Sequence, residues 1–100
     1  MAARRPSAIP STPPDRLSAQ AAEVWTEVIR RDRIHPSADA TTLEAYCELT
    51  VRWRETAAKL SAEGIVVDGG EKRGAIVHPA LAAVRQLGEQ LREWGPLFNR

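Results

Sequence analysis

Residues 42–69, TLEAYCELTVRWRETAAKLSAEGIVVDG, decide the fold of this 100-residue chain. They predict a long helix over residues 37–63, because a narrow apolar stripe recurs at helical spacing until Gly64 supplies a helix stop. The stripe consists of Leu43, Tyr46, Cys47, Thr50, Ala57 and Leu60, with Trp53 at its margin. A helix of about 25 residues is roughly 37 Å long, more than a core of this size can cover. Part of it must therefore pack outside its own chain or stay in solvent.

A shorter helix, over residues 19–32, is expected before the long one, with Ser18 as its N-cap. The long helix follows His35-Pro36-Ser37, where proline suits a first turn and Ser37 is the expected cap, while Asp39 lies at the positive end of the helix dipole. We expect the two helices to form an antiparallel pair. Its contact should consist of Trp25, Leu43, Tyr46, Trp53 and Leu60.

After the long helix, β-branched triplets at residues 65–67 and 75–77 flank a glycine-rich, charged loop and predict a small β-hairpin. An isolated two-stranded ribbon is marginal in water, so this one should lean on a helix or on a neighbouring subunit. A third helix, over residues 79–94, should begin at His78-Pro79 and end at Gly95-Pro96. Its coiled-coil-like seam, a candidate oligomer interface, consists of Leu81, Val84, Leu87, Leu91 and Trp94.

The predicted fold class is therefore mainly α: three helices with a small β-hairpin between the second and the third. Residues 1–16 contain four prolines and no apolar periodicity, which predicts a flexible, disordered arm. Residues 17–100 should form a single helical domain, as expected for a chain of this length.

The composition excludes several classes of protein. No apolar run approaches the roughly 20 residues needed to cross a bilayer, and the N-terminus lacks the apolar stretch of a secretory signal, so we expect a cytoplasmic protein with no membrane partner. Cys47 is the only cysteine, which excludes an intramolecular disulfide and a cysteine-based metal site. No nucleotide-binding glycine loop, zinc motif or nucleophile elbow is present. We expect neither catalysis nor a cofactor.

The remaining polar residues have ordinary structural interpretations. His35 and His78 each precede a proline at an element boundary, where a capping or turn role is favoured over metal binding. The charged face of the long helix reads as a solvated surface with i, i+4 ion pairs. These pairs are Glu48 to Arg52 and Glu55 to Lys59, and Glu44 lies on the same face.

Three small basic clusters are candidates for contact with DNA. They are Arg4 with Arg5 in the arm, Arg30 with Arg31 and Arg33 at the end of the first helix, and Lys72 with Arg73 in the hairpin loop. With a net charge of only +1, a monomer would bind duplex DNA weakly, because affinity grows with the number of phosphates neutralised. In a symmetric ring each cluster is repeated around the axis and becomes a basic belt.

The order of these pieces resembles the short family of phage terminase small subunits over about residues 13–98. The matching segments, in order along the chain, are LSAQAAEVW at 17–25, the stretch at 42–69 and GAIVHPALAAVRQL at 74–87. The most specific pieces are Leu43-Glu44-Ala45-Tyr46-Cys47 with Trp53 downstream, Glu63-Gly64-Ile65-Val66, and His78-Pro79.

The resemblance implies a role in viral DNA packaging in the cytoplasm of the infected bacterial host. The small subunit of such a terminase forms a homo-oligomeric ring, engages double-stranded viral DNA and modulates the ATPase and nuclease of the large subunit, which carries the catalysis. Family members continue past the third helix into a polar, basic tail, whereas this chain stops at Phe98-Asn99-Arg100, which leaves docking onto the large subunit open.

The alternative is a coiled-coil dimeric transcription regulator of a phage or plasmid. A helix-turn-helix needs two short helices, a tight turn and basic residues along the second helix. The predicted second helix is long and alternates in charge sign, so the ring is the favoured interpretation.

Overall fold

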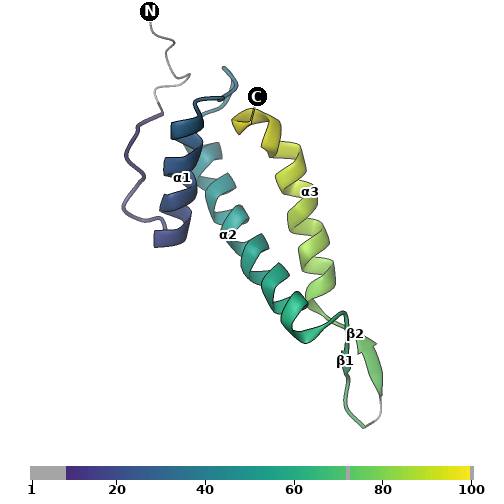
Figure 1. Cartoon of the computed structure of the whole chain (residues 1–100). Helices are drawn as coiled ribbons and strands as arrows, with labels where there is room; N and C mark the ends of the chain where they lie inside the picture. Colours follow the sequence, from purple (N-terminus) through teal and green to yellow (C-terminus); the bar gives the residue numbers. More distant parts are fainter. Residues whose placement is uncertain (1–8, 72, 100) are drawn as a thin grey trace, which may run out of the picture.

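The computed structural model describes residues 9–71 and 73–99 and confirms the predicted class, three helices with a two-stranded antiparallel hairpin between the second and third (Figure 1). The three helices run in alternating directions along the molecule, so each is antiparallel to the next. The elements are α1 (Ala19–Arg31), α2 (Ala40–Glu63), β1 (Val66–Asp68), β2 (Ala75–Val77) and α3 (Ala80–Phe98).

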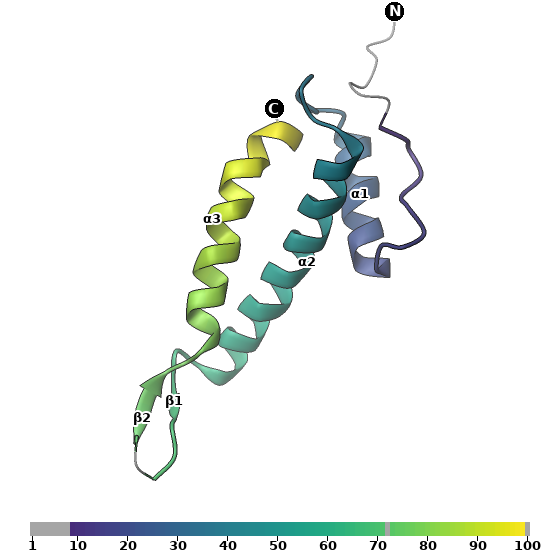
Figure 2. The ribbon, with the colours of Figure 1, turned by 180° about the vertical axis from the view of Figure 1, so that it is seen from behind.

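The molecule is a rod with principal extents of 65 × 24 × 18 Å. Its radius of gyration is 17.1 Å, against about 13 Å for a compact domain of 100 residues. The hairpin extends the molecule beyond its helices (Figure 1). The helices also differ in length: α1 has 13 residues and α2 has 24, about 20 Å against 36 Å. Only the first half of α2 is therefore covered by α1, and the second half packs on α3 alone (Figures 1 and 2).

Both ends of α1 follow from local chemistry. The Ser18 hydroxyl accepts a hydrogen bond from the Ala21 backbone N–H at 3.1 Å, which confirms the predicted N-cap. The helix ends one residue earlier than predicted, because Asp32 takes the left-handed conformation with φ of 52° and donates its N–H to the Val28 carbonyl.

The start of α2 differs from the prediction. Asp39, not Ser37, is the N-cap, and its carboxylate accepts from the Thr42 backbone N–H at 2.7 Å. The hydroxyl and backbone N–H of Ser37 instead lie 2.8 and 3.0 Å from Nδ1 of His35, in the preceding turn. The helix therefore begins at Ala40, three residues later than expected.

The core lies at one end of the rod, between α1, the first half of α2 and the end of α3. Its buried apolar residues are Ile9, Ala21, Val24, Trp25, Val28, Ile34, Ala38, Leu43, Cys47, Val51 and Phe98. The first described residues of the predicted flexible arm lie against this core: Ile9 is buried, and the Pro10 carbonyl accepts from Trp25 Nε1 at 3.0 Å. Residues 1–8 of the predicted arm lie outside the described residues.

The predicted α1–α2 contact was partly wrong. Trp25 and Leu43 are fully buried and Tyr46 packs against the core, as expected. Trp53 remains 36% exposed and Leu60 also lies outside the core, because α1 does not extend that far along α2.

The hairpin pairs Val66 with Val77 and Val67 with Ile76, so its first strand lies one residue later than predicted. Gly69 is required at the turn, because a Cβ there would lie 2.8 Å from the side chain of Ile76. Ile65, Val66 and Val77 are 57–61% exposed. The ribbon projects from the end of the rod remote from the core (Figure 1).

The third helix continues past its predicted end. We expected Gly95-Pro96 to stop it at residue 94, yet it runs through Pro96 to Phe98. Phe98 is fully buried, and its ring lies 4.9 Å from that of Tyr46. The His35 N–H also donates to the Leu97 carbonyl at 2.7 Å. Tertiary contacts thus outweigh the helix-breaking pair.

Candidate interaction surfaces

The arginine cluster at the end of α1 is partly neutralised. Arg30 and Arg31 both form ion pairs with Glu27, and the hydrogen bond from Arg30 holds the pKa of that carboxyl below its usual value. Arg31 also donates to Asn99 at 3.0 Å, which ties α1 to the end of α3. Arg33 is exposed and, among the described residues, has no ion-pair partner. This cluster therefore presents one free guanidinium and two shared ones.

The other predicted DNA contacts are far from this cluster or undescribed. Arg73 is exposed in the hairpin turn, at the opposite end of the rod from α1's last residues (Figure 1). Arg4, Arg5 and Lys72 lie outside the described residues. Among the described residues, the structure therefore keeps Arg73 apart from the arginines that end α1.

The apolar seam of α3 is half-buried along its whole length. Leu81, Val84, Leu87, Leu91 and Trp94 all keep part of their surface exposed. The only described residue of α3 that is buried is Phe98, at its end. Val84, Leu87 and Leu91 line grooves that α3 forms together with α2. In the described part of the chain, no third helix lies beside the half of this helix pair that is nearer the hairpin (Figure 2).

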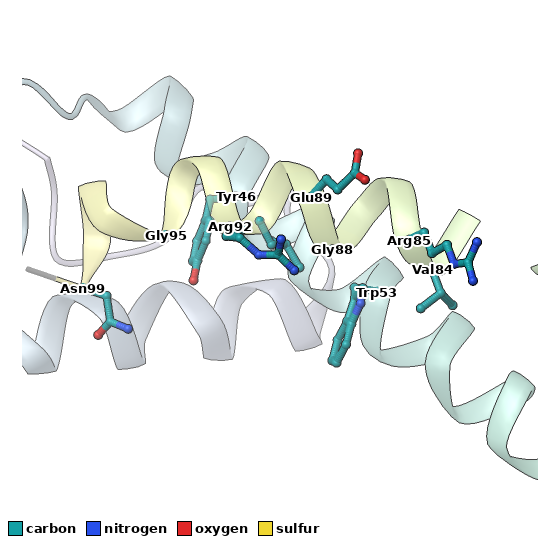
Figure 3. Close-up of a pocket in the computed structure, with 10 residues that line it drawn as sticks. Tyr46, Trp53, Val84, Arg85, Gly88, Glu89, Arg92, Gly95 and Asn99 are labelled. Carbon is teal, nitrogen blue, oxygen red and sulfur yellow. The ribbon is translucent and has the colours of Figure 1, made fainter. Parts of the chain in front are cut away.

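A groove of about 570 Å³ runs along α2 and α3 on one side of their contact (Figure 3). Tyr46 and Trp53 line it from α2, and Arg85, Gly88 and Arg92 are among the residues that line it from α3. A Cβ at Gly88 would lie 3.4 Å from Trp53 Nε1, so the glycine makes room for the indole. Our sequence reasoning missed this groove, although both pairs, 46 with 53 and 85 with 92, recur at a spacing of seven residues.

A second groove, of about 510 Å³, lies along the same two helices and shares no lining residue with the first. Arg52 and Glu55 line it from α2, and Gln86 and Gln90 line it from α3. The two grooves therefore flank the α2–α3 contact on its two sides.

The predicted ion pairs along α2 do not form in the described part of the chain, where neither Arg52 nor Lys59 is paired with a carboxylate. Two of the α2 carboxylates instead contact the segment before α1. Arg16 pairs with Glu44, a contact that raises the pKa of the guanidinium, and the Ser18 hydroxyl lies 3.1 Å from Glu48. Glu55 and Lys59 stay exposed.

Both histidines have the turn roles predicted for them. Nδ1 of His78 accepts from the Ala80 backbone N–H at 2.9 Å, at the start of α3, and its Nε2 lies 3.0 Å from Glu63 at the end of α2. In residues 9–71 and 73–99, no group of three histidine, cysteine or carboxylate side chains is arranged to hold a metal ion. Within the same residues, no helix has the length and apolar character needed to cross a membrane.

Comparison with known protein families gives a match over most of the chain. The family described as phage terminase, small subunit, matches residues 21–99, which span all three helices and the hairpin. Comparisons with curated proteins and with solved structures gave no significant match.

Proposed function

Because this chain belongs to the family of phage terminase small subunits, we propose that it forms a homo-oligomeric ring that recognises viral DNA and regulates the large subunit during packaging. Small subunits of this family are generally non-catalytic DNA-binding and regulatory proteins. The large subunit supplies the ATPase and nuclease, and this chain acts beside it, without a cofactor, in the cytoplasm of the infected bacterial host. The family match over residues 21–99 is the observation that carries the proposal.

Assembly into a ring is supported by the apolar surface that one chain leaves uncovered. The seam of α3 is half-buried throughout, and three β-branched residues of the hairpin region are more than half exposed. A two-stranded ribbon is marginal in water unless it packs on something else. A neighbouring subunit supplies that cover for both elements.

Contact with DNA is proposed at the arginines that end α1, with Arg73, Lys72 and the N-terminal Arg4 and Arg5 as further contributors. Since Glu27 shares the charge of Arg30 and Arg31, one chain offers too few free cations for tight binding. Repetition around a ring multiplies them. Such contacts reach phosphates and position the protein without reading sequence.

Light scattering tests the assembly. We expect a closed oligomer larger than a tetramer at micromolar concentration, against a chain mass of 11.0 kDa. A monomer or dimer under these conditions would contradict the ring and favour the dimeric regulator.

A DNA titration at two salt concentrations tests the arginine cluster. We expect Arg30→Ala/Arg31→Ala/Arg33→Ala to lower the affinity for DNA and to flatten its salt dependence. A protein that contacts fewer phosphates releases fewer counterions when it binds. Arg54→Ala, an exposed arginine in the middle of α2, is the control. Unchanged affinity for DNA with a lower melting temperature would show that the arginines only stabilise the C-terminal end of α1.

A further inference from the structure

Three charged residues of α3 border the larger groove in the order plus, minus, plus (Figure 3). Arg85, Glu89 and Arg92, the α3 charge triplet, are spaced by four and then three residues, which places them on one face of the helix. All three are exposed, and in the described part of the chain none of them takes part in an ion pair. This face of α3 is therefore open to charges from outside the chain.

Three charged residues of α2 form a triplet of the opposite signs. Glu48, Arg52 and Glu55, the α2 charge triplet, run minus, plus, minus along one face of α2. Arg52 and Glu55 line the second groove, on the other side of the α2–α3 contact. Glu48 accepts a hydrogen bond from the Ser18 hydroxyl, and no ion pair involves any of the three among residues 9–71 and 73–99. The two triplets therefore border opposite sides of one helix pair.

Two contacts fix the levels of α2 and α3 along the rod. Trp53 Nε1 lies 3.4 Å from the position of a Cβ at Gly88, and the Glu63 carboxylate lies 3.0 Å from Nε2 of His78. Glu63 is ten residues after Trp53, and His78 is ten residues before Gly88. Because the two helices are antiparallel, each residue forward along α2 therefore corresponds to one residue back along α3 (Figure 1).

This register places the two triplets at the same level along the rod. Counting along both helices from the contact between Trp53 and Gly88 matches every charge of one triplet with an opposite charge of the other, to within one residue or about 1.5 Å. The three level pairs are Arg52 with Glu89, Glu55 with Arg85, and Glu48 with Arg92. Within one chain these partners lie on opposite sides of the helix pair and do not meet.

We propose that copies of this chain stand side by side with their rods in the same direction, so that the α3 charge triplet of one copy pairs with the α2 charge triplet of the next. In this contact α3 and the neighbouring α2 are antiparallel. The next copy is reached by a sideways displacement and a turn about an axis along the rod, less than a right angle in a ring of more than four copies. Such a turn keeps both triplets at one level. The inference rests on the assembly in the proposed function and specifies its contact surface.

The contact repeats from copy to copy. Because it joins two different sides of the chain, it is heterologous, the kind of interface that closes into a ring when the rotation allows. Helices α2 and α3 then alternate around the ring, each antiparallel to both of its neighbours. Opposite charges at three levels set the register of the contact. Exposed ion pairs alone bind weakly, so the partly exposed Val84 and Leu91, which line the same groove as the α3 charge triplet, add apolar contact.

Charge reversal on each side separately tests the pairing. Arg85→Glu/Arg92→Glu reverses the outer charges of the α3 triplet, and Glu48→Arg/Glu55→Arg reverses those of the α2 triplet. We expect either full-length variant to lose self-association in light scattering and fall to the 11.0 kDa mass of one chain. The chain that carries all four substitutions restores opposite charges and should assemble again. Arg54→Glu, at an exposed arginine of α2 that lines neither groove, is the control and should keep the assembly.

Circular dichroism shows whether each reversed variant is folded. Arg85→Gln/Arg92→Gln, which should weaken assembly, replaces the α3 reversal if that variant unfolds. Because Glu48 also accepts a hydrogen bond from Ser18, Glu55→Arg alone replaces the α2 reversal if the double variant unfolds.

Disulfide crosslinking tests the level and direction of the contact. Arg52→Cys/Glu89→Cys, made in a Cys47→Ala chain, places thiols at the middle level pair. After oxidation we expect a ladder at multiples of 11.0 kDa on a denaturing gel without reductant. Glu48→Cys/Arg85→Cys is the control, because these positions differ in level by eight residues, about 12 Å. A disulfide joins Cα atoms only about 4.4–6.8 Å apart, so the control should give no ladder.

The outcomes separate this inference from the proposed function. A wild-type oligomer whose folded, reversed variants keep the full oligomeric mass would overturn the pairing and leave the ring intact. Loss of assembly in both variants without recovery in the four-substitution chain would also overturn it. A ladder from the control cysteine pair and none from the level pair would show that neighbouring rods run in opposite directions. A wild-type monomer would contradict the ring itself.

Discussion

Phe98 should be one of the strongest single contributors to stability, although it lies beyond a Gly-Pro pair near the C-terminus. Its side chain is fully buried and its ring packs on Tyr46 with centroids 4.9 Å apart. Removing a buried phenylalanine ring costs about 3–5 kcal/mol from the lost transfer energy and the cavity. Since a small domain has only about 5–15 kcal/mol of stability, Phe98→Ala should lower the melting temperature by more than about 10 °C.

The assay is thermal and urea unfolding, followed by circular dichroism at a fixed protein concentration because assembly raises apparent stability. Pro96→Ala is the matched control, since it restores a helical N–H two residues away and should raise stability by roughly 2 kcal/mol. If Phe98→Ala unfolded like the wild type, the end of α3 would not be anchored in the core. Burial of Phe98 would then fail as the reason that the helix passes Pro96.

Substitutions at three other residues test the rest of the described core and the cap of α2. Trp25→Ala should lower the free energy of unfolding, measured in urea, by about 3–5 kcal/mol. Trp25→Phe should lose less, mainly the hydrogen bond to the Pro10 carbonyl, worth about 0.5–1.5 kcal/mol. If Trp25→Ala unfolded like the wild type, the assignment of Trp25 to the core would be refuted. Burial, with Glu48 and Glu44 nearby, raises the pKa of the Cys47 thiol to about 12 from 9.0. Above pH 9.0 the thiol of the unfolded chain loses a proton that the folded chain keeps, so the free energy of unfolding should fall as the pH rises from 9.0 to about 12. Cys47→Ala should remove this contribution to the pH dependence. Hydrogen bonds from Thr42 lower the pKa of Asp39 in the folded chain. The stability that this carboxylate contributes is therefore present above its unfolded pKa and lost as the pH falls through its folded pKa. The melting temperature of Asp39→Asn should accordingly fall less steeply at acid pH than that of the wild type.

Most of the fold could be predicted because it depends on local patterns. The apolar stripe from Leu43, the Ser18 cap and the two β-branched triplets each specify an element within a few residues of chain. The groove between α2 and α3 was missed because a spacing shows which residues share a helix face and not which groove that face borders.

The three helices and the hairpin could be predicted from residue order, since periodicity, caps and glycine stops act over single turns of chain. Where the elements end and which surfaces they cover depends on how they pack together. Helix α3 continues past Pro96 because the burial of the Phe98 ring outweighs the effect of a local helix breaker. Trp53 stays 36% exposed because α1 is about 16 Å shorter than α2 and does not reach it. Both outcomes depend on contacts between residues far apart in the chain, which no local pattern contains.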